Sequence, residues 1–151
     1  QGPKNRLFIL NKLLIKYYGD NHNKFVNNFY LSLEDIKKMK DLGAKFGSHT
    51  SSHMHLSYLS KKKQREEIFD SFEYLESLNV ISKDDLKILS YPYGSYNNNT
   101  LSILENSYVD FAVTCEAKEA TLKDINSEYT LARWNTNDWW DKNYKKPISP
   151  I

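Results

Sequence analysis

Three of the four histidines of this chain lie close together, at positions 49, 53 and 55. His49 comes just after the short stretch 44–47, whose apolar residues and closing glycine predict a strand leading into the histidine. His53 follows four positions later, about one helical turn, so both imidazoles can point to the same side. Because imidazole nitrogens are good ligands for divalent transition metals, the pair predicts half of a metal site. The alternative is that both are ordinary residues of a polar loop.

Two further groups that could take part in a reaction also lie at the ends of predicted strands. The sequence Tyr-Pro-Tyr-Gly at 91–94 follows a predicted strand over 87–91, and Arg133 lies in the strand-like stretch 129–134. In α/β folds, sites form at the carboxyl ends of parallel strands, so we expect these groups to meet His49 at one edge of a sheet. Taken alone, Tyr-Pro-Tyr-Gly is typical of a turn, and Arg133 of a surface residue.

The elements that would hold these residues alternate along the chain. Apolar residues at three- and four-residue spacing predict helices, two of which have a serine N-cap, Ser32 or Ser60. The alternation implies an α/β fold with a mostly parallel sheet and helices packed outside it. The predicted helices cover 6–18, 33–42, 61–78 and a stretch ending at 105 that is capped by Asn99 or Thr100; the predicted strands cover 44–47, 87–91, 109–115 and 129–134.

Composition bounds the class of protein. The chain has 151 residues, of which 40% are hydrophobic and 26% charged, as expected for one globular domain. No apolar run approaches the ~20 residues of a membrane-spanning helix. The net charge of +2 gives no case for nucleic acid as a partner. The tail 142–151 contains two prolines and is expected to be loosely attached.

The lone cysteine and the tryptophans can each be interpreted as structural or as functional residues. Cys115 excludes an internal disulfide, and its place at the end of an apolar run predicts a buried structural thiol more than a nucleophile. Trp134, Trp139 and Trp140 can either stack on a sugar ring or belong to a core or an interface.

Three motifs together resemble the polysaccharide deacetylases, the NodB-homology family. His-Thr-Ser-Ser-His at 49–53, with a leucine three residues on, resembles the family's second motif, H-[ST]-x-x-H. Ser-Tyr-Pro-Tyr-Gly at 90–94 resembles the third motif, R-x-P-Y-G, with Ser90 at the arginine position. Leu-Ala-Arg at 131–133 is similar to the L-P-R element of the fourth motif, with Ala132 in place of proline. The resemblance runs in the family's order from about 31 to 134.

The resemblance implies a NodB-type distorted or partial (β/α) barrel that removes acetyl groups from N-acetylated sugars of a polysaccharide or glycan. His49 and His53 would hold a divalent metal, foremost zinc, with cobalt, nickel or manganese as alternatives. The backbone N–H of Tyr93 would stabilise the oxyanion, and Arg133 would pair with the catalytic carboxylate. The residues expected to shape the substrate site are Pro92, Gly94 and Trp134.

Two of the family's motifs have no counterpart in the sequence. The first, T-F-D-D-G, supplies the catalytic base and the third metal ligand in the family, and nothing before His49 matches it; Asp20 is assigned neither role. The histidine of the fifth motif has no counterpart after His55. We therefore expect the first strand or strands to be missing and this chain to be inactive or weak by itself. An exposed sheet edge could then pair with a second copy. The alternatives are a non-catalytic glycan-binding member of the same fold, and a structural domain whose histidines are incidental.

Overall fold

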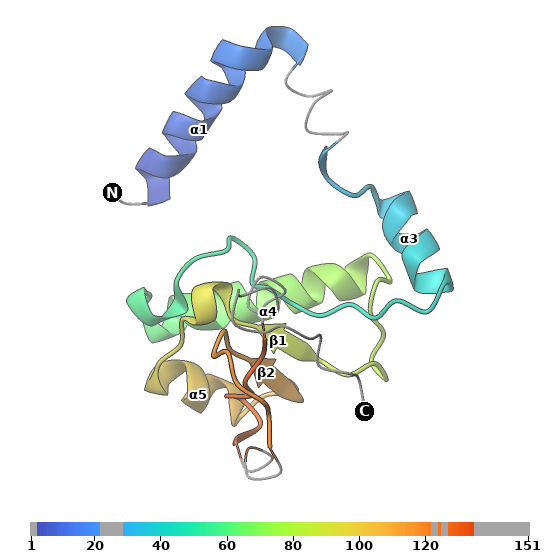
Figure 1. Ribbon diagram of the computed structural model, residues 1–151, viewed down its shortest axis with the longest axis vertical. Helices are drawn as coiled ribbons and strands as arrows, with labels where there is room; N and C mark the ends of the chain where they lie inside the picture. Colours follow the sequence, from blue (N-terminus) through green and yellow to red (C-terminus); the bar gives the residue numbers. More distant parts are fainter. Residues whose placement is uncertain (1–2, 22–28, 122–123, 125–126, 135–151) are drawn as a thin grey trace, which may run out of the picture. The chain divides into compact units, whose positions relative to one another are not determined.

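The computed structural model describes residues 3–21, 29–121, 124 and 127–134 (Figure 1). The chain forms two compact units, Gln1–Lys45 and Phe46–Ile151. Trp139, Trp140 and the tail 142–151 lie outside the described residues. The single domain inferred from the sequence stays a prediction.

The first unit is helical. Helix α1 spans Pro3–Tyr18 and is followed by a 3-10 turn, Gly19–Asn21. Helix α3 spans Leu33–Asp41 and begins with a capping box. The Ser32 hydroxyl accepts from the Asp35 N–H at 3.1 Å, and the Asp35 carboxylate accepts from the Ser32 N–H at 3.0 Å. Both predicted helices are therefore confirmed, and α1 starts earlier than expected, at a proline suited to a first helical turn.

The second unit contains the longest described helix and a short one. Helix α4 spans Lys61–Ser77, and the Ser60 hydroxyl caps it by accepting from the Lys63 N–H at 3.3 Å. Helix α5 spans Asn98–Leu104. Its N-cap is Asn97, so the predicted caps at Asn99 or Thr100 are wrong. Asn97 has the extended backbone that a cap requires, and its side chain accepts from the N–H groups of the other two residues.

The sheet is small and parallel. Strands β1 (Ile88–Ser90) and β2 (Phe111–Val113) pair in parallel, with Leu89 opposite Ala112. Isolated parallel bridges extend the sheet on both sides, from Ser48 to Leu89 and from Val113 to Leu131. Four segments thus lie side by side in chain order, with α4 and α5 in the first two connections (Figure 1). This is the α/β arrangement that the sequence predicts.

Two predicted strands are wrong in extent. Only Ser48 bridges β1 near the expected strand 44–47, and only Leu131 bridges β2 within the expected strand 129–134. Ser48 makes both ladder bonds at its edge, because its N–H donates to the Ile88 carbonyl and its carbonyl accepts from Ser90, each at 2.8 Å. Residues 44–47 are half-buried or exposed, so their apolar pattern lacks the packing partner that would extend the strand.

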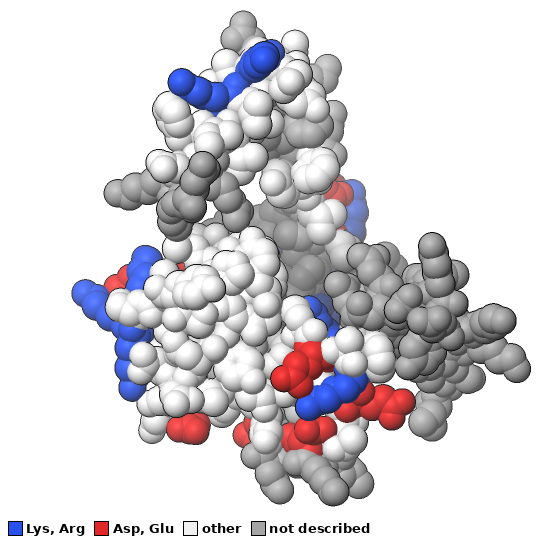
Figure 2. All heavy atoms as spheres, turned by 60° about the vertical axis from the view of Figure 1, so that its left-hand side comes forward, with Lys and Arg blue, Asp and Glu red and all other residues white. Residues whose placement is uncertain are grey.

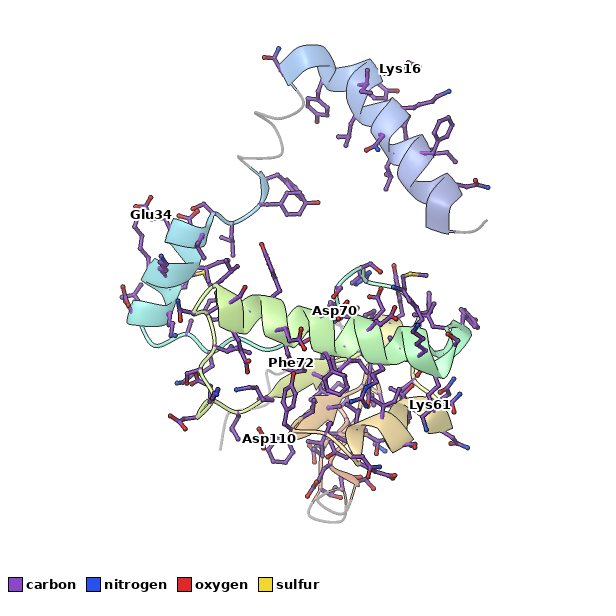
Figure 3. The ribbon with its side chains drawn as sticks, turned by 180° about the vertical axis from the view of Figure 1, so that it is seen from behind. Lys16, Glu34, Lys61, Asp70, Phe72 and Asp110 are labelled. Carbon is purple, nitrogen blue, oxygen red and sulfur yellow. The ribbon has the colours of Figure 1, made fainter. Side chains whose placement is uncertain are left out.

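The core lies between α4, α5 and the sheet. Ile68 and Phe72 of α4 and Leu89 of β1 are fully buried. Figure 3 shows Phe72 on the side of α4 that faces the strands. Tyr91, directly after β1, is also buried; its hydroxyl donates to the Tyr129 carbonyl at 2.8 Å, and burial raises its pKa. Burial of this apolar surface is the main force that holds the carboxyl ends of the strands in place.

The amino ends of the strands are tied by a buried lysine. Lys87 precedes β1, and its ammonium donates to the carbonyls of Ser82 and, at 3.1 Å, Asp85. The Glu76 carboxylate lies 3.5 Å from the same nitrogen. These bonds compensate the burial of the charge, so this end of the sheet has a structural role. Among the described residues, no helix combines the length and apolar character needed to cross a bilayer.

Candidate active site

His49 leaves the sheet at the carboxyl end of the Ser48 segment. Its Nδ1 lies 2.6 Å from the carbonyl oxygen of Ser90, the last residue of β1. Because a carbonyl can only accept, Nδ1 carries a proton, and in the neutral imidazole Nε2 is then the nitrogen with the lone pair. A backbone carbonyl on one ring nitrogen is the usual device that orients a metal-binding histidine.

His53 faces His49 across the loop. The ring centroids lie 4.8 Å apart, with the rings inclined at 67°. Zn–N bonds of about 2.0–2.1 Å at a tetrahedral angle place two imidazole centroids roughly 5 Å apart, so the observed spacing fits a shared ion. The two rings lie on the same side, as the four-residue spacing led us to expect, but the segment between them is a loop and not a helical turn. Thr50 and His53 have φ values of 64° and 55°, and this left-handed loop brings the rings together.

The Tyr-Pro-Tyr-Gly turn lies against the histidine loop. Pro92 is buried, while Tyr93 has a left-handed backbone (φ 59°, ψ 16°) and is half exposed. The Tyr93 ring lies 4.8 Å from the His53 ring and stacks on the His55 ring at 4.0 Å and 11°. The His55 ring therefore packs against this turn.

Gly94 allows this turn to approach the end of β2. Its φ is +64°, and a Cβ there would lie 3.1 Å from both the backbone nitrogen and the Cβ of Cys115. Glycine meets both requirements, since it tolerates a left-handed backbone and has no Cβ. Cys115 itself is exposed, so the prediction of a buried thiol is wrong. The strand ends at Val113 and burial ends at Thr114, which leaves Cys115 beyond the sheet.

Arg133 reaches the same edge from the segment after Leu131. Its Nη1 donates to the Ser90 hydroxyl at 3.0 Å, and its Nη2 lies 3.8 Å from the Cys115 sulfur. Ser90 thus binds His49 through its carbonyl and Arg133 through its hydroxyl. Trp134 follows Arg133 and is half-buried.

Sequence reasoning named Ser90 only as a departure from the family's arginine. Its position near the end of a predicted strand, directly before Tyr-Pro-Tyr-Gly, was the signal that could have identified it.

Among the described residues, His49 and His53 are the imidazoles that face one another, while His55 packs on Tyr93. In the described part of the chain, no three residues among His, Cys, Asp and Glu gather as a metal-binding group. On the face in Figure 2, acidic and basic side chains occur next to one another and much of the surface is uncharged.

Comparisons with known proteins place this geometry in a family. The family model described as polysaccharide deacetylase matches residues 4–112. A curated Bacillus subtilis protein named "Putative polysaccharide deacetylase YxkH" is 29% identical over 120 residues, which are 80% of this chain and 38% of that protein.

Two solved structures are similar in fold. The Streptococcus pyogenes deacetylase PplD, solved with acetate, matches with a TM-score of 0.61 and 31% identity, over 69% of this chain and 44% of that one. BC0361, a polysaccharide deacetylase from Bacillus cereus, shares the fold with a TM-score of 0.57 and 24% identity, over 69% of this chain and 32% of that one. The chain thus spans less than half the length of these relatives. It belongs to the polysaccharide deacetylase family.

Proposed function

We propose that this chain carries the metal-binding and oxyanion-stabilising part of a deacetylase that hydrolyses the amide of N-acetylated sugars in a glycan. One observation carries the proposal: His49, His53 and Tyr93 converge at the carboxyl edge of a parallel sheet. Membership of the polysaccharide deacetylase family supports the reaction class and the carbohydrate substrate.

The proposed metal ligands are His49 and His53. Their ring spacing and the proton that the Ser90 carbonyl fixes on Nδ1 of His49 suit a divalent ion. Zinc is the metal we propose first, and cobalt, nickel or manganese bind similar ligands. When bound, such an ion polarises a carbonyl and lowers the pKa of a water ligand to about 7.

The turn at 92–94 is proposed to stabilise negative charge on the substrate oxygen. The Tyr93 N–H would donate to the oxyanion, as backbone amides do in other acyl-transfer sites. Pro92 restricts the turn, and Gly94 permits its approach to Cys115, so both hold the amide in position.

Arg133 and Trp134 complete the proposed site. The Ser90 hydroxyl accepts a hydrogen bond from Nη1 of Arg133. The planar guanidinium of Arg133 has several N–H donors, so it suits pairing with a carboxylate that acts in the reaction. Trp134 would contact the sugar through its ring.

The four parallel segments are proposed to belong to a larger sheet. We infer that their chain order continues a NodB-type partial barrel, to which the described residues before Ser48 contribute no strand. The outer edge at Ser48 would pair with a further strand, and a second copy of the chain is one source of it.

A second candidate is glycan binding without hydrolysis. It is favoured by the ligand set in the described residues, which gathers two imidazoles and no third group. A site with two ligands is expected to hold metal weakly, so sugar binding could persist where hydrolysis does not.

One experiment separates these functions. The 151-residue chain is incubated with Zn²⁺ and N-acetylglucosamine oligomers, and NMR follows both sugar binding and acetate release. Acetate release, even if slow, that His49→Ala abolishes supports the deacetylase. Saturable sugar binding that is the same with and without Zn²⁺, without acetate release, supports the glycan-binding candidate. The absence of both sugar binding and acetate release contradicts the two proposals.

A further inference from the structure

Glu67 of α4 is a buried carboxylate that the proposed reaction does not use. The residue is 3% exposed. Its two oxygens bind one residue of the histidine loop: Oε2 accepts from the Ser52 N–H at 2.8 Å and Oε1 from the Ser52 hydroxyl at 2.6 Å. Hydrogen bonds to an ionised carboxylate are stronger than neutral ones, so this is a firm attachment between helix and loop.

The backbone of Glu67 holds the neighbouring residue as well. Its carbonyl accepts from the Ser51 N–H at 3.0 Å. Thr50 and His53 both have a left-handed backbone, and Ser51 and Ser52 are the two residues between them. Such backbone in a residue other than glycine persists only where the surroundings impose it. Glu67 therefore binds the middle of the loop whose shape aims His53 at His49.

A second attachment fixes the beginning of the loop. The Thr50 N–H donates to the Ser48 hydroxyl at 3.2 Å, and the Ser48 and Ser71 hydroxyls are hydrogen-bonded. The Ser71 hydroxyl donates in turn to the Ile68 carbonyl at 2.9 Å. Ser71 lies one helical turn after Glu67, so one face of α4 holds both halves of the loop.

We propose that Glu67 is a positioning residue for the metal site: through Ser52 it holds the loop in the shape that lets His49 and His53 reach one cation. This rests on the proposed function, since it concerns the same two imidazoles. Glu67 lies behind the loop and binds it, and need not touch the cation. Its effect is on the orientation of His53.

Glu67→Gln tests the proposal with little change in size. Glutamine keeps one acceptor oxygen for the Ser52 N–H, but its NH₂ group can only donate, so the Ser52 hydroxyl has to turn round and accept. Both remaining bonds are then between neutral groups and are weaker than bonds to a carboxylate. Glu66→Gln is the matched control, because Glu66 is the adjacent residue of α4 and pairs with Lys63 at 3.1 Å, away from the loop.

The measurement is Zn²⁺ binding to the full 151-residue chain by calorimetry, with NMR of the loop amides. We expect Glu67→Gln to weaken zinc binding by about 10- to 100-fold, the usual effect of an outer partner of a metal ligand. The Ser51–His53 amide signals should shift or broaden even without zinc. Glu66→Gln should leave both readouts unchanged.

Ser52→Ala is the second variant, should Glu67→Gln fail to fold. Ser52 is exposed, and the change removes only the hydroxyl bond, so we expect a smaller loss of zinc affinity with the fold intact. If the unmodified chain binds zinc and neither Glu67→Gln nor Ser52→Ala differs from Glu66→Gln, the positioning role is overturned while the metal site stands. If the unmodified chain binds no zinc, both proposals fall.

Discussion

Gly47→Ala should separate the His49 segment from the sheet. A Cβ on Gly47 would lie 2.6 Å from the Ile88 carbonyl oxygen, a backbone atom that cannot rotate away. Side-chain carbons do not come this close to backbone oxygens, so the Ser48 segment would have to move outward by several tenths of an ångström.

The size of the effect follows from the bonds at this point. The Ser48 N–H donates to Ile88 and the Ser90 N–H to Ser48, both at 2.8 Å. Each such bond contributes a net ~0.5–1.5 kcal/mol, so loss or stretching of both should lower the free energy of unfolding by about 1–3 kcal/mol. The same shift would lengthen the 2.6 Å contact between His49 and the Ser90 carbonyl.

Urea unfolding of the unmodified chain and of Gly47→Ala measures the loss of stability. The NMR shift of the His49 Nδ1–H measures the change in its contact with Ser90. Gly19→Ala is the control for alanine itself, because its Cβ would meet nothing within 4 Å and only the positive φ of 51° is strained. If Gly47→Ala unfolds at the same urea concentration as the unmodified chain and its His49 signal is unchanged, the Ser48 segment does not lie against β1 as described.

Three further changes test the fold. Phe72→Ala should lower the free energy of unfolding by about 3–5 kcal/mol, because it empties a fully buried site under α4; urea unfolding at half that cost or less would contradict the packing. Lys87→Met should cost about 1–3 kcal/mol by leaving the carbonyls of Ser82 and Asp85 without their buried donor, and normal stability would show that water replaces it. Hydrogen bonds from the side chain and backbone of Ser32 hold the pKa of Asp35 below its usual range. The ionised cap therefore stabilises α3 fully at pH values above the ordinary aspartate pKa of about 4, and this stabilisation is lost as the pH falls through the lowered pKa. Circular dichroism should therefore show helix loss in acid that Asp35→Asn flattens, and identical acid profiles would exclude this role.

Local signals made the helices predictable. Ser32 and Ser60 are N-caps whose partners lie three residues on, so the whole interaction is contained in a few residues of sequence. The strands were less predictable because pairing depends on distant segments. Ser48 and Leu131 each make a single bridge, and nothing in their own neighbourhoods sets that limit.

Some residues of the candidate site could also be identified from the sequence, and others could not. His49, His53 and Tyr93 stood out through residue type and their place after predicted strands. Ser90 and Glu67 did not, because serine and a helical glutamate are common, and their importance here comes from partners roughly forty and fifteen residues away. Cys115 shows the converse error, since an apolar run predicted burial for a residue that lies past the end of its strand.

The claim on which the account depends is that His49 and His53 share one divalent cation. Long-range ¹H–¹⁵N NMR of the imidazoles during a zinc titration, with His49→Ala and His53→Ala in parallel, tests it most directly. One equivalent of zinc should shift Nε2 of His49, because Nδ1 is bound to the Ser90 carbonyl, and should shift the His53 ring in the same step. Either variant should weaken binding by at least about tenfold. Independent titration of the two rings, or unchanged zinc affinity in both variants, would contradict a shared site.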